Sequence, residues 1–320
     1  MAQATLLATL ANLADERIAT ALALAPLEED IHTSPLLGEI LYQRNDPERW
    51  VRICEIPLKF KDLELERRIS FGLEKVNGIR RMPGRWDIER VRRILESASS
   101  LIKNLPNANP RKPRLAGLAL YHGGIVEHAG GNFLQAALCH QLSAAFPGAS
   151  SLSQAIANFM AVNELVNHAL AETGAPSEEL LGQFADRDRE IQSVLDMNTA
   201  EGRRWNINRL CFRQRVAWLC GQQMSQKDIN EIFSSRGEFG SSFDHCLAVI
   251  DSALRIKHQR FLNLGDALNS MDLDWKSEAW LLVAECDRAR ALCNLLDLES
   301  KGHGGHVARA IARRMLESSM

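Results

Sequence analysis

The chain has 320 residues, of which 46% are hydrophobic and only 6% aromatic, and its formal net charge at pH 7 is −2. This length can bury a full-sized core, either as one elongated array or as two domains. A near-neutral chain lacks the overall basic character typical of nucleic-acid-binding proteins. Since no run approaches the roughly 18–20 apolar residues that span a bilayer, we expect no membrane segment.

The N-terminal stretch 1–26 is rich in alanine and leucine but is interrupted by Asp15, Glu16 and Arg17. It has no basic region before the apolar residues, so we interpret it as an amphipathic helix rather than a signal peptide. The chain has 7 cysteines, none in a C-x-x-C pair, and two of them lie on an apolar stripe at helical spacing in 279–296. Buried thiols suit a reducing compartment, and we therefore expect a cytoplasmic location.

Charge alternates strongly along the chain. The net charges of four successive blocks are −6 for 1–66, +9 for 67–114, −8 for 115–202 and +3 for 203–320. Blocks of this size can attract one another or attract different partners.

Apolar residues recur at three- and four-residue steps through most of the chain, and proline and glycine fall at the breaks. This pattern predicts an all-α fold. Three breaks carry signals for the start of a helix, namely Ser34 before Pro35, Asp46 before Pro47, and Ser177 before two glutamates. The stretch 50–60 alternates partly, as a strand would, but Pro57 argues against a central strand and we interpret it as helical.

The best domain boundary is 105–114, LPNANPRKPR, which contains three prolines. These prolines cannot continue a helix, so we expect a linker or long loop here. It would separate an N-terminal helical region, 1–104, from a second helical region, 115–320. A weaker break falls at 198–202.

The stretch 115–147 predicts two helices of about fifteen residues joined by a turn at Gly130, Gly131 and Asn132. Such a hairpin cannot bury its own apolar face and must stack on neighbours, as in helical-repeat proteins. Two pairs of short segments are similar in sequence and indicate further repetition: 85–91 resembles 204–210, and 131–133 resembles 237–239. Their offsets, 119 and 106 residues, define no single period, so a degenerate repeat and coincidence both remain open.

The hairpin resembles a tetratricopeptide repeat, whose signature is W-x-x-L-G-x-x-Y, then A-x-x-x-F, then P. Gly124 matches the glycine at the close approach of the two helices, Ala136 follows at the required spacing, and 131–133 matches the usual turn. The departures are Leu120 for tryptophan, Gly123 for leucine, Glu127 for tyrosine, His140 for phenylalanine, and Pro147 one residue early. Residues 234–265 give a poorer second match.

The resemblance implies a helical-hairpin array, a tetratricopeptide-like α-solenoid, that binds a partner protein or peptide along a concave face. First helices commonly line that face, which implies a partner site at Tyr121, His122, Glu127 and His128. We therefore expect a non-enzymatic interaction or adaptor module, with an enzyme of unfamiliar all-α type left open. The sequence does not predict an oligomeric state.

Metal and cofactor chemistry has little support in the sequence. His122, His128 and His140 fall in one hairpin, but neither H-E-x-x-H nor the Glu-x-x-His pair of di-iron bundles is present. His303 and His306 flank two glycines that more simply mark a turn. Phosphate-binding loops and the G-x-S-x-G elbow are also absent, so we expect no metal and no cofactor.

A basic block at 75–93 is the second functional signal, because its arginines surround one tryptophan. Arginines can contact phosphates while an indole stacks on a base. The alternative function is thus an accessory protein that binds nucleic acid, and the competing explanation is that the arginines face the chain's own acidic blocks. The candidate residues are Arg80, Arg81, Arg85, Trp86, Arg90, Arg92 and Arg93.

Overall fold

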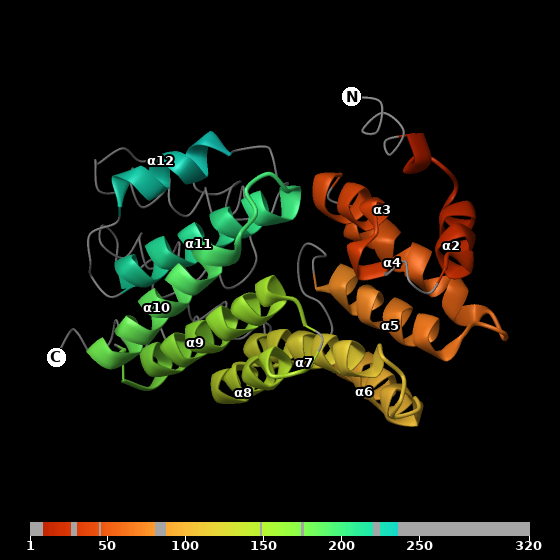
Figure 1. Cartoon of the computed structure of the whole chain (residues 1–320), viewed down its shortest axis with the longest axis horizontal. Coiled ribbons are helices and arrows are strands. Elements are labelled where there is room, and N and C mark those ends of the chain that lie inside the picture. Colours follow the sequence, from red (N-terminus) through yellow and green to blue (C-terminus); the bar gives the residue numbers. More distant parts are fainter. Residues whose placement is uncertain are drawn as a thin grey trace, which may run out of the picture. The chain divides into compact units, whose positions relative to one another are not determined.

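The computed structural model describes residues 9–26, 31–44, 46–80, 88–147, 149–173, 176–219 and 225–235. Within these ranges the chain is helical and contains no strand, which confirms the predicted all-α class (Figure 1). The longer helices are α2 (Asp15–Leu24), α4 (Pro47–Glu55), α5 (Leu65–Ile79), α6 (Ile88–Asn104), α7 (Lys112–Ala129), α8 (Phe133–Ala144), α9 (Ser151–Thr173), α10 (Glu178–Val194), α11 (Ala200–Leu219) and α12 (Gln226–Ser234). No helix in these ranges is long and apolar enough to cross a membrane.

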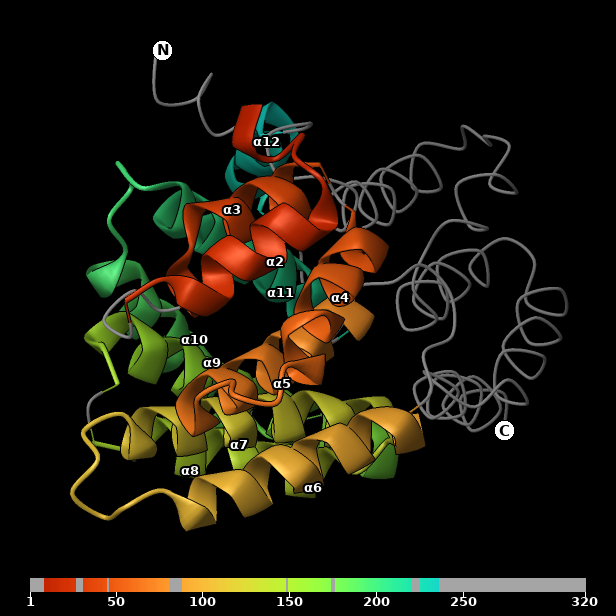
Figure 2. The ribbon, with the colours of Figure 1, turned by 90° about the vertical axis from the view of Figure 1, so that its right-hand side faces the viewer.

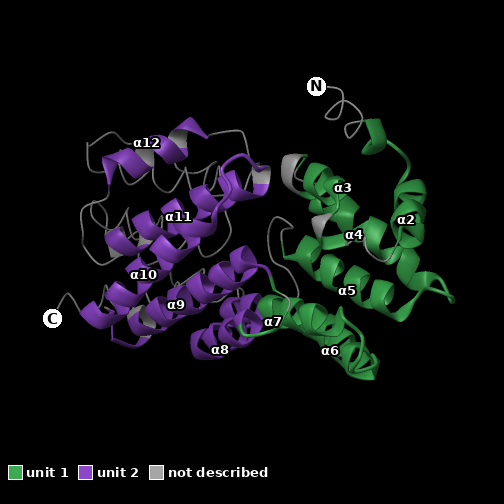
Figure 3. Ribbon diagram, in the orientation of Figure 1, with its two compact units in different colours: residues 1–123, 145–149 green, residues 124–144, 150–320 purple. Residues whose placement is uncertain are grey.

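The chain divides into two compact units (Figure 3). Unit 1 contains residues 1–123 and 145–149, and unit 2 contains residues 124–144 and 150–320. The loop predicted at 105–114 lies in unit 1, between the end of α6 and the first turn of α7. Lys112 closes this loop, because its ammonium donates to the carbonyl of Leu105 at 2.6 Å and to the side chain of Asn107 at 2.9 Å.

The N-terminal part of unit 1 packs short helices around Trp50 and Phe71, both of which are fully buried. Helix α2 lies against α4 in this unit (Figure 2). The helix start predicted before Pro47 is confirmed, since the Asp46 side chain accepts from the Arg49 amide at 3.0 Å. The ambiguous stretch 50–60 is helical as interpreted, with α4 followed by the short 3₁₀ helix η3 (Pro57–Lys59).

The predicted hairpin is present, with α7 ending at Ala129 and α8 beginning at Phe133. Gly131 in the turn has a φ of 77°, a left-handed conformation that glycine adopts without steric cost. Gly124 of α7 faces the His140 ring of α8. A Cβ built on it would lie 2.6 Å from two ring atoms of His140.

Unit 2 stacks successive helices, α8 on α9, α9 on α10, and α11 on α12. Its apolar centre is Phe159, whose ring centroid is 5.2 Å from Phe184 and 5.7 Å from Phe212. The predicted start of α10 is confirmed, because the Ser177 hydroxyl accepts from the Leu180 amide at 3.2 Å.

A buried polar network joins α10, α11 and α12. Arg209 contacts Asp188 at 3.2 Å, and Arg213 contacts the same carboxylate at 3.0 Å. Arg213 also donates to Asp228, which accepts from Gln214 at 2.6 Å. Burial alone would lower the pKa of Arg213, but its bond to Asp228 and the charge of Asp188 raise it, so these ion pairs persist at neutral pH.

Helix boundaries recur after 90 residues. Helices α6 and α10 begin at residues 88 and 178 and end at residues 104 and 194, so both ends are 90 residues apart. Helices α7 and α11 end at residues 129 and 219, and α8 and α12 end at residues 144 and 234. This spacing is neither of the offsets found in the sequence. Positions 90 residues apart therefore occupy equivalent places on α6 and α10, whereas the starts of α7 and α11 are 88 residues apart and those of α8 and α12 are 93 residues apart.

Candidate functional site

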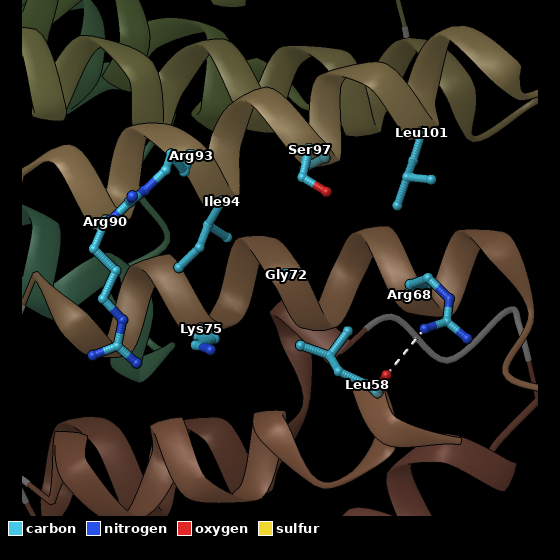
Figure 4. Close-up of a pocket in the computed structure, with 10 residues that line it drawn as sticks. Leu58, Arg68, Gly72, Lys75, Arg90, Arg93, Ile94, Ser97 and Leu101 are labelled. Carbon is cyan, nitrogen blue, oxygen red and sulfur yellow. Dashed lines mark hydrogen bonds between the residues drawn. The ribbon is translucent and has the colours of Figure 1, made fainter. Parts of the chain in front are cut away.

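A groove of about 420 Å³ lies between α5 and α6 in unit 1. Its volume falls in the range of small-ligand and peptide-side-chain pockets. Figure 4 shows Ile94 and Leu101 extending from α6 toward α5, with Leu58 of η3 on the opposite wall. Together with Ala98 these residues form an apolar floor. Arg90, Arg93 and Ser97 are exposed, so this side of the groove is open to solvent.

Four cationic side chains line the same groove: Arg68, Lys75, Arg90 and Arg93. One carboxylate faces two of them, because Glu55 lies 2.7 Å from the Lys75 ammonium and 3.4 Å from the Arg90 guanidinium. Among the residues that the structure describes, no carboxylate pairs with Arg93. Because Glu55 brings one negative charge to two cations and Arg93 adds another positive charge, the groove can attract an anion.

Arg68 is held in place by backbone oxygens. Its guanidinium donates to the carbonyl of Leu58 at 3.0 Å and to the carbonyl of Phe60 at 2.8 Å. Carbonyl oxygens orient the guanidinium but carry no net charge, so these two bonds leave the positive charge of Arg68 in place. The result is a pre-positioned cation beside an apolar floor.

Residues of α9 and α10 that lie 90 positions after the groove residues show whether helix packing requires the cations of the groove. The four cations correspond to Asn158, Leu165, Leu180 and Gln183, none of which is charged. Of the apolar floor, Ile94 and Leu101 correspond to the buried Phe184 and Ile191, whereas Ala98 corresponds to the buried Asp188 and Leu58 to Gly148. Helices α9 and α10 therefore pack without cations. The four cations of the α5–α6 groove are therefore not repeated at the equivalent positions of α9 and α10.

The structure divides the predicted basic block. Arg90 and Arg93 line the groove, whereas Arg92 pairs with Glu89 on its own helix at 2.7 Å. Arg80 donates to Asn77 at 3.2 Å. The remaining members of the prediction, Arg81, Arg85 and Trp86, lie outside the described residues.

Sequence reasoning missed Arg68, although a signal was available. Arg68, Gly72 and Lys75 are spaced four and three residues apart and therefore share one face of α5. All three line the groove. The competing explanation for the basic block also has support, since Lys75 and Arg90 do pair with Glu55 from the acidic block 1–66.

The four partner-binding residues inferred from the resemblance occupy different environments. His122 is buried with 5% of its surface exposed, and Tyr121 is half-buried with its ring edge against His122. Glu127 accepts from the Asn132 side chain at 2.7 Å beside the turn. The His128 ring points to a buried carboxylate, Glu164 of α9.

Glu164 is completely buried and is surrounded by donors. His128 Nδ1 lies 2.7 Å from its Oε2, and the Asn167 side chain donates to the same oxygen at 3.1 Å. Burial alone would raise the pKa of Glu164. The charge and hydrogen bond of His128, the charge of His140 and the bond from Asn167 together hold that pKa below its ordinary value.

Unit 1 contains the same arrangement 90 residues earlier. Glu74 is buried, accepts from Trp50 Nε1 at 3.2 Å and from the Asn77 side chain at 3.1 Å, and is paired with His32. Both carboxylates thus belong to a Glu-x-Val-Asn sequence and meet a histidine from an earlier segment. Among the described residues, no group of three or more histidine, cysteine or acidic side chains is arranged to hold a metal ion.

The fold and the groove together define an all-α protein with a cationic groove that has an apolar floor. Comparison of the chain with protein-family models, with curated proteins and with solved structures gave no match. The residues of the groove are therefore the basis for the functional argument.

Proposed function

We propose that the chain is a non-enzymatic binding protein that holds an acidic segment of a partner protein in the α5–α6 groove. The observation that carries this proposal is the combination of four cations with an apolar floor in one groove. A peptide that alternates carboxylates with leucine or similar side chains complements both features. The absence of the four cations at the equivalent positions of α9 and α10 supports a role in binding rather than in folding.

The proposal keeps the helical-groove function inferred from the sequence but places the site at α5 and α6 rather than on the first helix of the hairpin. The tetratricopeptide-like solenoid remains a proposal about the architecture. The recurrence of helix boundaries after 90 residues supports a repeated helical array of some kind.

Nucleic acid is the second candidate ligand, because the same cations could contact phosphates. The floor argues against it. Ile94, Leu101 and Leu58 offer aliphatic contact, whereas single-stranded nucleic acids bind through aromatic side chains on which bases stack. None of the described residues lining this groove is aromatic.

Fluorescence anisotropy with the full chain tests the proposal. The probes are a labelled peptide of alternating glutamate and leucine, a leucine-to-serine version of it, and a single-stranded oligonucleotide of equal charge. We expect Arg93→Glu to weaken binding of the first peptide about tenfold, since it replaces attraction by repulsion. Arg92→Glu is the matched control, because Arg92 is the neighbouring residue, undergoes the same charge change and does not line the groove.

The outcomes separate the two candidates. Tighter binding of the oligonucleotide than of the acidic peptide would favour nucleic acid and overturn the proposal. Equal effects of the Arg92 and Arg93 substitutions would show that binding depends on general charge rather than on this groove. If the serine peptide binds as tightly as the leucine peptide, the apolar floor does not contribute to binding.

A further inference from the structure

Helix α5 has a glycine at the base of the groove that helix packing does not require. Gly72 is buried in the helix and lines the groove between α5 and α6. A Cβ built on it would meet no described neighbour within 4 Å, whereas one built on Gly78 of the same helix would lie 2.7 Å from Val51. Glycine is the poorest helix former after proline, so an alanine at position 72 would favour the helix. The missing side chain therefore matters for the shape of the groove rather than for the fold.

The corresponding place between α9 and α10 is filled by larger side chains. Glu-x-Val-Asn begins two residues after position 72 and again two residues after position 162, so Gly72 corresponds to Val162. Val162 is buried, and so is Phe184, which corresponds to Ile94 of the groove. Two helices in this arrangement can thus pack with larger side chains. The smaller pair in unit 1 leaves open the part of the groove over Gly72, which we call the Gly72 hollow.

Cations flank the Gly72 hollow on both sides. Arg68 precedes Gly72 by four residues and Lys75 follows it by three, so their Cα atoms lie about 6 Å and about 4.5 Å from it along the helix axis. Figure 4 shows Arg68 on one side of Gly72, and Lys75 together with Arg90 and Arg93 on the other. An apolar side chain that enters the hollow therefore has a positive charge on either side of it, where carboxylates of the same segment would be attracted.

We propose that the Gly72 hollow takes one large aliphatic side chain of the partner, and that the groove selects segments in which leucine or a similar residue lies between carboxylates. The inference rests on the proposed function and narrows the acidic segment to this class. Gly72 leaves the space for the side chain, and the apolar floor makes its burial favourable. Arg68 and Arg93, the two lining cations that Glu55 does not pair with, would face the flanking carboxylates.

Fluorescence anisotropy with the full chain tests the inference with two labelled peptides. Both have glutamates on either side of a central residue, which is leucine in one peptide and alanine in the other. We expect the unsubstituted chain to prefer the leucine peptide about tenfold, as a pocket does when a ligand loses a few carbon atoms. Gly72→Leu fills the hollow with the chain's own side chain. It should weaken binding of the leucine peptide about tenfold and abolish the preference over the alanine peptide.

A smaller substitution and a matched control separate binding from folding. Gly72→Ala favours the helix and meets no described neighbour, so this variant should unfold at a higher temperature than the unsubstituted chain. Its methyl group should nevertheless weaken binding of the leucine peptide at least about threefold. Gly182→Leu is the control, because Gly182 also lies within a helix and is open to at least 4 Å, but it is exposed and does not line the groove. Its binding should equal that of the unsubstituted chain.

The outcomes distinguish this inference from the proposed function. If the unsubstituted chain binds neither peptide, or if Arg93→Glu leaves binding unchanged, the proposed function and the inference both fail. If Arg93→Glu weakens binding but Gly72→Leu keeps the preference for leucine, the proposed function stands and the inference is overturned. Equal affinity of the unsubstituted chain for the two peptides would also overturn the inference.

Discussion

Glu164 and Glu74 are buried carboxylates that the fold surrounds with donors. In both cases an asparagine three residues later on the same helix donates to the carboxylate, and a histidine from an earlier segment pairs with it. Leaving such a carboxylate without donors would cost several kcal/mol, so each cluster fixes the position of the chain segments that supply those donors.

Glu164→Gln should destabilise the chain by about 2 kcal/mol, because the neutral amide no longer balances the charge on His128. This loss is smaller than the roughly 3–5 kcal/mol for breaking a fully buried pair, because the His128 side chain remains 23% exposed and keeps part of its hydration. Urea unfolding at pH 7 measures the loss. An unchanged unfolding midpoint would mean that the His128–Glu164 contact contributes nothing to stability.

The same residue predicts a pH dependence. The pKa of Glu164 is lower in the folded chain than its ordinary value of 4.5, so its carboxylate stabilises the fold fully above that ordinary value. The contribution is lost as the pH falls through the lower folded pKa. The difference in unfolding free energy between the unsubstituted chain and Glu164→Gln should therefore shrink as the pH falls below the ordinary value of 4.5. A difference that stays constant as the pH falls below this value would contradict the lowered pKa.

The sequence predicted the starts of helices and the turns between them more completely than it predicted the groove. The starts at Pro47 and Glu178, the turn at Gly131 and the close approach at Gly124 were all predictable, because capping residues, glycine and proline act locally. The 90-residue recurrence was not predictable. It is preserved in the positions where helices end and in Glu-x-Val-Asn, whereas the side chains around these positions have diverged.

The groove was only partly predictable for a related reason. Arg90 and Arg93 were found as members of a basic block, but Arg68 and Leu58 come from other elements, and only tertiary packing brings them together. The four residues of the inferred partner site lie in different environments, because helical periodicity does not distinguish a histidine facing solvent from one that faces a buried carboxylate. His128 and Glu164 are 36 residues apart in the sequence.

Gly124→Ala tests the close packing of α7 on α8. The added methyl would meet the completely buried His140 ring at 2.6 Å, so we expect a loss of about 1–3 kcal/mol from overpacking. Gly182→Ala is the matched control, since its added methyl in α10 would meet none of the described neighbours within 4 Å. That change should stabilise the chain by about 0.5–1 kcal/mol through helix propensity. Thermal unfolding compares the two, and equal shifts would contradict the packing argument.

For the whole molecule, the alternating charge of the sequence acquires a structural meaning in unit 1. The positive block 67–114 supplies the four cations of the groove, and the acidic block 1–66 supplies Leu58 of its wall and Glu55, which pairs with Lys75 and Arg90. The excess positive charge remains beside apolar side chains. This arrangement is the basis for the proposed binding of an acidic, partly apolar segment.

Arginine footprinting tests the central claim most directly, because it needs no substitution. The full chain is treated with phenylglyoxal with and without saturating acidic peptide, and modified residues are quantified by mass spectrometry. We predict that bound peptide slows modification of Arg90 and Arg93 about tenfold. This is the decrease in rate expected when the peptide occupies about nine-tenths of the sites and only the free sites react. Arg189 of α10, with 72% of its side chain exposed, should react at an unchanged rate. Unchanged reactivity of Arg90 and Arg93 under conditions where the peptide is bound would contradict binding in the α5–α6 groove.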